Sequence, residues 1–371
     1  MKLRSQSFLN AAIALSVLGL GGCLAIYSAR SFGENPYYFV FRQLLWLGSG
    51  VLFFLLLAKI PFRYYEKYAW HLAGLSFFSL ILLPVFGTTI NGMRGWFSIG
   101  EAFLIQPSEL AKAPYLLLLS VIAANAEASP RRRFLLMAGT GAAFCGIILL
   151  QPDFGTASVY FAGLAMVVFI SGFQFCFLTL LAAAALPCTL LFLLNHEYAM
   201  ARIAGYLNPD AHLLGAGWHI KQFQYTLAHG GLFGSEWGGA LWSNAYLPLS
   251  HSDSAFAAIV ESGGGAGGLL ILGGFLAMVW LFREMALSRK SETARILIFS
   301  AGAVCAVQAL LHIGVNTALL PPTGLTLPIF SYGGSSLFGT MALFGMACSA
   351  SALEHATGAQ TEKKSANTVE F

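Results

Sequence analysis

Asp253 is the first candidate for chemistry, because its carboxylate stands where a long polar stretch meets a long apolar one. Ionisable side chains in or beside membrane segments are rare and usually mark function. A carboxylate in that position could accept a proton as a general base. It could equally cap the following helix, since Asp is a preferred N-cap, and the two roles are compatible. The preceding Ser250, His251 and Ser252 do not form a hydrolytic triad with it, because adjacent residues do not converge on one point.

Further ionisable residues lie beside other apolar segments. Glu109 and Lys112 are three residues apart, so on a helix they share one face and can pair, as a plain structural ion pair or as part of a site. Glu261 follows Asp253 by eight residues, which on a helix separates the two carboxylates by about 12 Å. That separation is too large for two carboxylates that share a proton. We therefore expect each carboxylate to act alone or with a cation from another segment.

Composition indicates which kind of scaffold positions these residues. The chain of 371 residues is 57% hydrophobic and only 10% charged, whereas soluble proteins carry about 25% charged residues. Apolar runs recur at roughly 20 residues, the length that a helix needs to cross a membrane. The runs do not alternate with polar residues, so they predict helices and not a β-barrel. The sequence predicts an all-α polytopic membrane protein with about ten transmembrane helices, over Phe8–Tyr27, Phe41–Leu57, Trp70–Phe86, Pro107–Ala126, Phe134–Leu150, Ala157–Ile170, Gln174–Leu194, Asp253–Phe282, Ile296–Asn316 and Ser335–Leu353.

The distribution of basic residues predicts the orientation of these helices. Lysines and arginines gather in short loops between alternate spans, as expected for cytoplasmic loops. This pattern places both termini in the cytoplasm and the aspartates Asp153, Asp210 and Asp253 on the outer side. The basic residues of the outer side and its adjoining spans are few: Arg30, Arg42, Arg94, Lys112, Arg202 and Lys221.

The same pattern divides the chain into one domain and a tail. Residues 1–353 form a single transmembrane domain, whose largest outer loop covers about 195–252, between the seventh and eighth helices. That loop holds aromatic and glycine-rich pieces, which favour short amphipathic helices on the membrane surface. Residues 354–371 form a polar, disordered cytoplasmic tail. Gly263–Gly268 is typical of a helix-packing face made of small residues.

Several classes of function are disfavoured. The net charge of +4 is spread between the spans, so it does not indicate nucleic-acid binding. The six cysteines lie in apolar stretches without paired spacing, which favours small buried residues over disulfides or metal ligands. The loop histidines lack the spacing of metal ligands. The residues alone therefore predict no metal site.

A series of motifs runs along the chain, mostly after the third span. They are Asn91–Trp96 (NGMRGW), Gln106–Lys112 (QPSELAK), Gln151–Thr156 (QPDFGT), Gly230–Gly234 (GGLFG), Leu247–Gly267 with Asp253 and Glu261, and Pro321–Ser336 with SYGGSS at its end. These motifs, in this order, resemble the signatures of the SEDS family (shape, elongation, division and sporulation), which includes RodA, FtsW and SpoVE. Such motifs in the right order on a ten-span scaffold are specific to this family.

The chain departs from the family pattern at a few positions. Ser254 stands where Phe usually follows the aspartate, and Ser262 replaces the second glutamate of a pair. In the outer loop, His219 and Phe223 replace common Gln and Ser residues, while Gln222 matches the pattern. Thr326 also replaces a frequent proline. The aspartate itself is retained.

The resemblance implies a peptidoglycan glycosyltransferase of the bacterial cytoplasmic (inner) membrane, which polymerises lipid II during cell elongation or division. In that reaction the 4-hydroxyl of one disaccharide attacks the anomeric carbon of another, and undecaprenyl pyrophosphate leaves. Asp253 would act as general base. The implied substrate-binding residues include cations that would stabilise the pyrophosphate, acidic residues that would orient these cations, and one amide: Arg94, Glu109, Lys112, Arg202, Lys221, Gln222 and Glu261. A divalent cation such as Mg²⁺ or Mn²⁺ could share the pyrophosphate.

The resemblance also implies partners and leaves alternatives open. The expected partners are lipid II, the membrane and a class B penicillin-binding protein, the transpeptidase that would cross-link the product. A lipid II flippase with the same residues along a translocation path is an alternative, as is a non-catalytic scaffold for the transpeptidase. The polar residues cluster near one leaflet and do not run across the membrane, which favours the enzyme.

Overall fold

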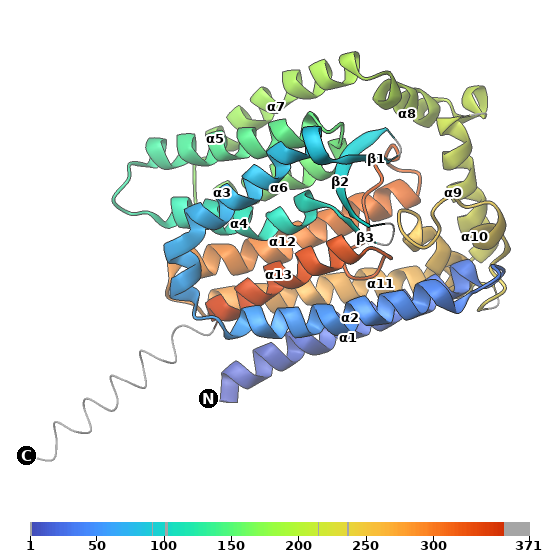
Figure 1. Cartoon of the computed structure of the whole chain (residues 1–371), viewed down its shortest axis with the longest axis horizontal. Helices are drawn as coiled ribbons and strands as arrows, with labels where there is room; N and C mark the ends of the chain where they lie inside the picture. Colours follow the sequence, from blue (N-terminus) through green and yellow to red (C-terminus); the bar gives the residue numbers. More distant parts are fainter. Residues whose placement is uncertain (1, 91, 101–102, 214, 236, 352–371) are drawn as a thin grey trace, which may run out of the picture.

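The computed structural model describes residues 2–90, 92–100, 103–213, 215–235 and 237–351. The predicted disordered tail, 354–371, lies outside these residues. The described chain is a bundle of long helices with a small sheet and a group of shorter helices at one end (Figure 1). Its helices are α1 (Lys2–Arg30), α2 (Tyr37–Lys59), α3 (Phe62–Phe86), α4 (Pro107–Ala124), α5 (Pro130–Leu149), α6 (Phe154–Ile170), α7 (Phe175–Asn195), α8 (Glu197–Leu207), the 3₁₀ turn η1 (Pro209–His212), α9 (Ala216–Gly230), α10 (Leu241–Ala245), α11 (Ala255–Leu287), α12 (Glu292–Asn316) and α13 (Gly334–Ser351).

The prediction of a helical polytopic membrane protein agrees with this architecture. Seven of the described helices are long and apolar enough to cross a membrane: α1, α2, α3, α5, α7, α11 and α12. The other three predicted spans coincide with α4, α6 and α13, which are shorter helices packed into the bundle. The predicted amphipathic helices of the outer loop are α8, α9 and α10.

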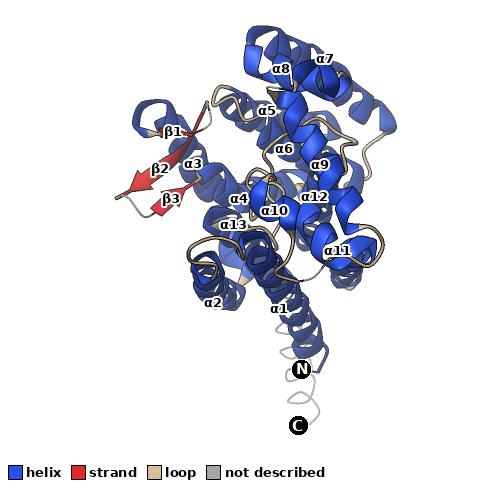
Figure 2. Ribbon diagram, turned by 90° about the vertical axis from the view of Figure 1, so that its right-hand side faces the viewer, coloured by secondary structure: helices blue, strands red, loops and turns tan. Residues whose placement is uncertain are grey.

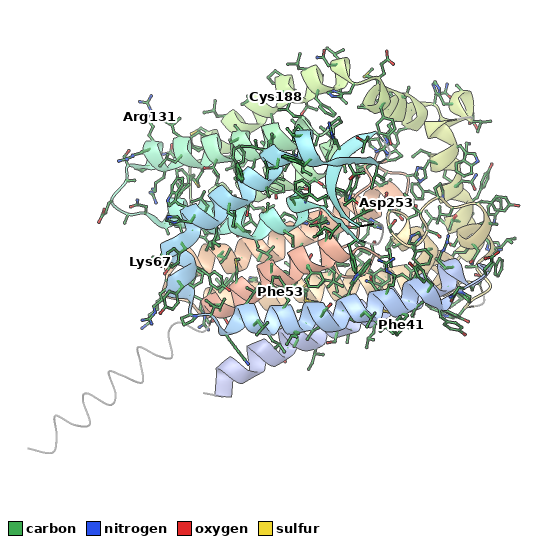
Figure 3. All side chains as sticks on the ribbon, viewed as in Figure 1. Phe41, Phe53, Lys67, Arg131, Cys188 and Asp253 are labelled. Atoms are coloured by element: carbon green, nitrogen blue, oxygen red, sulfur yellow. The ribbon has the colours of Figure 1, made fainter. Side chains whose placement is uncertain are left out.

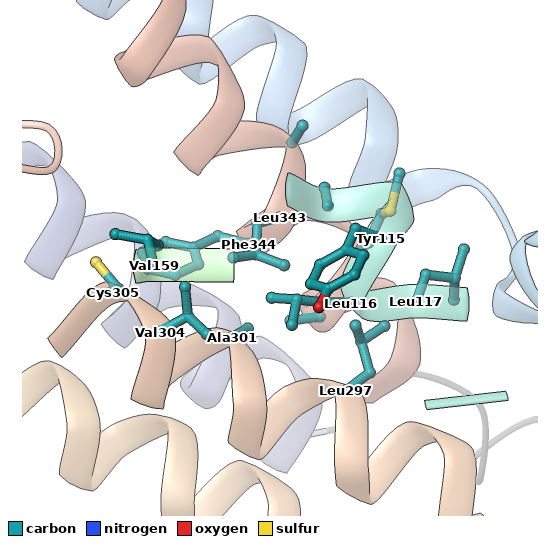
Figure 4. Packing of buried hydrophobic residues seen from close by; sticks show 14 of the residues in the cluster. Tyr115, Leu116, Leu117, Val159, Leu297, Ala301, Val304, Cys305, Leu343 and Phe344 are labelled. Atoms are coloured by element: carbon teal, nitrogen blue, oxygen red, sulfur yellow. The ribbon is translucent and has the colours of Figure 1, made fainter. Parts of the chain in front are cut away.

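The core of the bundle is formed by α4, α6, α12 and α13, whose apolar side chains meet in its centre (Figure 4). Tyr115 of α4, Val304 of α12 and Phe344 of α13 are almost completely buried there. By contrast, outer helices such as α3 and α7 expose large apolar side chains, including Leu75 and Leu186. An apolar exterior is stable in lipid, so the burial pattern fits a membrane-embedded bundle.

A three-stranded antiparallel sheet follows α3, where the sequence predicted only an outer loop. Its strands are β1 (Thr88–Ile90), β2 (Met93–Ile99) and β3 (Phe103–Ile105), and β2 is central. The sheet lies beside the helices at the end of the bundle that carries α8–α10 (Figures 1 and 2). Short polar-apolar alternation inside an otherwise helical chain is a weak signal, which explains the missing prediction.

Helix α11 is interrupted at Gly264, and this break corrects the prediction of a helix-packing face at Gly263–Gly268. Gly264 has φ 68° and ψ −174°, which is not helical. The break frees backbone groups that pair with the turn after α9: Gly265 N–H donates to Gly231 O at 2.9 Å, and Ser235 N–H donates to Glu261 O at 2.7 Å. The glycine-rich stretch therefore receives a turn of the outer loop and not a neighbouring helix.

We predict that Gly264→Ala destabilises the protein, because Gly264 has positive φ and a Cβ there would lie 2.3 Å from Leu232 O. A strained residue of this kind costs about 1–3 kcal/mol, so the unfolding midpoint of purified protein in detergent should fall. Gly273→Ala in the same helix is the matched control, since a Cβ there meets nothing within 4 Å. Equal midpoints for the two variants would contradict the role of the break.

Candidate active site

A large cavity of about 1530 Å³ opens at the end of the bundle that carries the sheet. Its wall combines α2, the sheet, the starts of α4 and α6, the end of α7, α8, and the loops around 249–253 and 321–336. Asp253, Glu109 and Arg202 line this cavity. Of the other predicted site residues, Arg94, Lys112, Lys221, Gln222 and Glu261 are not among the described residues that line it.

The backbone around Asp253 is held by hydrogen bonds from three different segments. Ser331 Oγ donates to Ser252 O at 2.7 Å, and Asn316 Nδ2 of α12 donates to Asp253 O at 3.0 Å. Within the loop, Ser254 N–H donates to Leu249 O at 3.2 Å. Leu249 itself has φ 47°, an uncommon conformation for a residue other than glycine. These contacts fix the main chain, so the position of the carboxylate is defined by the fold.

The helix-capping interpretation of Asp253 is wrong. Helix α11 begins at Ala255, its N-cap residue is Ser254, and no side chain caps it. The Ser254 hydroxyl donates instead to Pro248 O at 2.7 Å. Asp253 instead lines the cavity, near the end of the bundle opposite to Lys67 and Arg131 (Figure 3).

The environment of Asp253 brings its pKa close to neutrality. Burial raises the pKa of the carboxyl group to about 7, and nearby Asp153 adds to this rise. A hydrogen bond from Ser252 and the positive charge of Arg202 act in the opposite direction. A Cβ at Gly324 would lie 3.6 Å from Asp253 Oδ2, so the glycine leaves room beside the carboxylate. A carboxyl group with a pKa near 7 is suited to exchange a proton at neutral pH.

Arg202 lies on α8 and reaches the loop beside Asp253. Its Nη1 donates to Pro322 O at 3.0 Å, two residues before Gly324. Its guanidinium also stacks 4.4 Å from the ring centroid of Tyr198 and donates to the Tyr198 hydroxyl. These contacts hold a positive charge at the cavity wall close to the carboxylate.

Glu109 and Lys112 form the ion pair that their spacing predicts. Lys112 Nζ lies 2.8 Å from Glu109 Oε2, and both side chains are about 95% buried. Lys112 also donates to Gln308 Oε1 at 2.8 Å, and Gln308 Nε2 donates to Thr326 O at 3.0 Å. The pair thus connects the cavity wall to α12 and to the loop before α13. Glu109 faces the cavity, and Lys112 lies behind it.

The remaining predicted cations have other partners. Arg94 donates to the carbonyl groups of Gly87 and Val85, so it closes the turn between α3 and the sheet. Lys221 pairs with Asp210 at 2.8 Å on the exposed side of the outer loop. The sequence predicted that both residues bind substrate, whereas neither is among the described residues that line the cavity, because side-chain direction depends on contacts that spacing does not reveal.

Glu261 is completely buried and holds the outer loop. Its carboxylate accepts hydrogen bonds from Trp242 N–H at 2.8 Å, Ser243 N–H at 2.7 Å and the Ser243 hydroxyl. His229 Nδ1 lies 2.9 Å from the same group. Gln222 is also buried, and its Oε1 has no partner among the described residues. Glu261 thus supports α9 and α10, while Gln222 is a buried residue of α9, and neither is among the described residues that line the cavity.

Two features of the cavity wall were not assigned to the site from sequence. Arg42 of α2 lines the cavity, where its guanidinium stacks between Tyr38 and Trp46 at 5.5 Å and 5.2 Å from their ring centroids. Asp153 caps α6 by accepting from Thr156 N–H at 2.9 Å, and Gln106 Nε2 donates to it at 3.3 Å. The sequence did contain a signal for Arg42, because an arginine beside an apolar span usually marks function.

The acidic side chains at the cavity limit how a metal ion could bind. Among the described residues, no group of three or more His, Cys, Asp or Glu side chains could hold a metal ion. Besides Asp253, the acidic side chains on the cavity wall include Asp153 and Glu109, of which Glu109 is paired with Lys112. Mg²⁺ is commonly bound by one or two carboxylates together with substrate phosphates. The donors present therefore fit a cation that arrives with a phosphorylated substrate.

Comparison with known proteins supports this description. The family model for FtsW, RodA and SpoVE, described as "Cell cycle protein", matches residues 5–356. The "Probable peptidoglycan glycosyltransferase FtsW" of Coxiella burnetii is 31% identical over 88% of this chain and 89% of its own length. "Stage V sporulation protein E" of Bacillus subtilis is 33% identical over 91% and 94%.

A solved structure gives the same result for the fold. A chain described under "Structural coordination of polymerization and crosslinking by a peptidoglycan synthase complex" superimposes with a TM-score of 0.79. It is 28% identical, and the match covers 93% of this chain and 97% of that chain. Together with the family match over nearly the whole length, this similarity shows that the chain belongs to the FtsW, RodA and SpoVE family of cell cycle proteins.

Proposed function

We propose that this protein is a peptidoglycan glycosyltransferase that polymerises lipid II, with Asp253 as its general base. The observation that carries the proposal is a carboxyl group with a pKa near 7 on the wall of a large cavity that has apolar walls and two arginines. A lipid-linked sugar needs both a polar reaction site and an apolar surface for its chain. The named activity of the FtsW relatives agrees with this chemistry.

In the proposed reaction, Asp253 and Arg202 each have one role. Asp253 accepts the proton of the 4-hydroxyl of the acceptor disaccharide, whose oxygen attacks the anomeric carbon of the donor. The bond between that carbon and the pyrophosphate oxygen breaks, and its electron pair leaves with undecaprenyl pyrophosphate. Because the attack is direct, the anomeric centre inverts. Arg202, held near Asp253, stabilises the negative charge of the departing pyrophosphate.

The other predicted site residues act through these groups. The Glu109–Lys112 pair shapes the cavity wall and its electrostatic field, with Glu109 facing the substrate. The remaining four residues affect substrate binding indirectly, through the segments around the site to which they belong: Arg94, Lys221, Gln222 and Glu261. A divalent cation, Mg²⁺ or Mn²⁺, would be held by the Asp153 carboxylate on the cavity wall and by the pyrophosphate, whose charge it would neutralise, so that Asp253 stays available as the base.

The proposed topology is a single transmembrane domain over 1–353 with ten crossings and both termini in the cytoplasm. Lys67 and Arg131 lie at the end of the bundle opposite to Asp253 (Figure 3), as the positive-inside rule requires if the cavity faces outward. In a bacterial cytoplasmic membrane this orientation presents the cavity to lipid II in the outer leaflet. A class B penicillin-binding protein is the proposed partner, because the similar solved structure is of a synthase complex that coordinates polymerization and crosslinking.

Replacement of Asp253 tests the function directly. We expect Asp253→Asn to lower the rate of glycan formation from labelled lipid II at least about a hundredfold, because general-base catalysis contributes that much. Glu284→Gln, which changes an exposed carboxylate paired with Arg283 away from the cavity, is the control and should polymerise normally. Purified protein is assayed alone and with its transpeptidase. Normal product from Asp253→Asn would exclude the base assignment, and no product from the unmodified protein in any pairing would favour the flippase or the scaffold.

The rate should also depend on pH in a defined direction. Because the pKa of Asp253 is raised to about 7, the carboxyl group becomes protonated and inactive as a base below that pH. We expect kcat/KM to reach a plateau above pH 8 and to fall about tenfold per pH unit below 7. A pH profile of initial polymerisation rates measures this. A rate that stays constant down to pH 5 would show that another group takes the proton.

The buried ion pair predicts a strong effect on stability. Glu109→Gln leaves the Lys112 ammonium buried without its carboxylate, which should destabilise the protein by about 3–5 kcal/mol. The double variant Glu109→Gln/Lys112→Met should recover most of this loss. Glu292→Gln is the matched control, because its pair with Arg295 has the same spacing but is exposed, and should change stability by less than about 1 kcal/mol. Denaturation in detergent measures the stability of each variant. Equal losses of stability for Glu109→Gln and Glu292→Gln would show that the Glu109–Lys112 pair is not buried.

A further inference from the structure

Two parts of the cavity wall each carry an arginine, and we call them the arms of the cavity. One arm runs along α2 and the sheet, and includes Arg42, Trp46, Phe53 and Phe103. The other runs to the end of α7 and the start of α8, and includes Phe192 and Arg202. Figures 1 and 3 show α2 on one side of the labelled Asp253 and α7 and α8 on the other. Each arm thus combines one arginine with apolar walls.

The arm along α2 has the form of a site for a lipid pyrophosphate. Arg42, Trp46, Ser49 and Phe53 line it and are spaced by four, three and four residues, so they share one face of the helix. This face descends about 16 Å from the arginine to the last aromatic ring. Phe53 packs against Phe338 of α13, with ring centroids 5.7 Å apart. A charged group at the outer end and an apolar track below it match a pyrophosphate joined to a prenyl chain.

The two arginines differ in their distance from the reacting carboxylate. Arg202 binds Pro322 O in the loop whose Gly324 adjoins Asp253, and its charge acts on that carboxylate. Arg42 stacks on Trp46, whose ring lies 4.8 Å from that of Tyr332, and Tyr332 N–H donates to His251 O at 2.8 Å. The charge of Arg202, and not that of Arg42, is among the influences on the pKa of Asp253, which indicates that Arg42 lies farther from the carboxylate.

The chemistry of the proposed polymerisation requires this difference. The donor is attacked at the carbon that carries its pyrophosphate, so the donor pyrophosphate must lie close to the general base. The acceptor attacks through the 4-hydroxyl at the far end of its disaccharide, so its own pyrophosphate lies two sugar rings away. A cavity that binds both substrates thus needs one cation near the general base and a second cation about two sugar rings away from it.

We infer that the arm along α2 binds the acceptor lipid II, with its pyrophosphate on Arg42, and that the arm at α7 and α8 binds the donor, with its pyrophosphate on Arg202. This assignment rests on the proposed glycosyltransferase function. It gives Arg42 a role in binding one substrate only. Arginine suits that role because its planar guanidinium forms paired hydrogen bonds with phosphate.

Two analogues of lipid II, each of which can take only one role, limit the reaction to one coupling and allow the two arms to be tested separately. A 4-deoxy lipid II lacks the attacking hydroxyl and serves only as donor. A lipid II in which a methylene group replaces the anomeric oxygen keeps its charge but cannot lose pyrophosphate, and serves only as acceptor. With purified protein, Arg42→Ala should raise KM for the acceptor analogue about tenfold or more, with little change in KM for the donor analogue. Arg202→Ala should instead lower kcat.

The controls distinguish a local effect from a general one. Arg63→Ala removes an arginine that also stacks on a tyrosine, Tyr64, but outside the cavity, and it should leave both constants unchanged. Arg42→Lys should recover part of the lost acceptor affinity, because it retains the charge. An Arg42→Ala variant that raises KM for the donor, or that lowers kcat with both KM values unchanged, would overturn the assignment. Polymerisation of native lipid II by the unmodified protein is measured in parallel, and its absence would reject the proposed function itself.

Discussion

The site depends on how the main chain around Asp253 is held at the end of an apolar bundle. An unsatisfied backbone group in such a place is costly, so irregular backbone persists only where other groups bind it. Here Ser331 binds the carbonyl of Ser252, and Asn316 binds that of Asp253. Asn316 Oδ1 also accepts from Ala257 N–H at 3.0 Å, so one side chain holds both the loop and the first turn of α11. With the main chain satisfied in this way, the carboxylate can face the cavity.

The outer loop is positioned by a second set of buried polar contacts. Glu261 joins α11 to α10 and α9, while Ser262 Oγ lies 2.6 Å from Ser28 Oγ of α1. Gly238 N–H and Ser31 Oγ extend this connection from α1 to the loop before α10. The departures from the family pattern at Ser254 and Ser262 are thus used in structural hydrogen bonds. Neither removes a group from the cavity, so both are compatible with an intact reaction site.

The long apolar elements were predictable from the sequence, because hydropathy over 20 residues is a strong signal in a chain with few charges. Asp253, Glu109 and Arg202 were also correctly expected to meet at one end of the bundle. Side-chain direction was not predictable for Arg94, Lys221 or Glu261, since it is decided by contacts between segments distant in sequence. The break of α11 was missed for a related reason: glycine permits both close helix packing and positive φ, and only the docked turn distinguishes the two.

A continuous cavity with two cation sites has a consequence for repeated synthesis. After each coupling, the longer glycan is attached to the lipid that served as acceptor, which on our assignment lies in the arm along α2. The next cycle requires this lipid in the donor arm, with its pyrophosphate moved from Arg42 to Arg202. Because both arginines line the same cavity as Asp253, the pyrophosphate can pass between them without entering the apolar core. Separate pockets would require the charged group to cross lipid, or the product to be released into water and bound again before each addition.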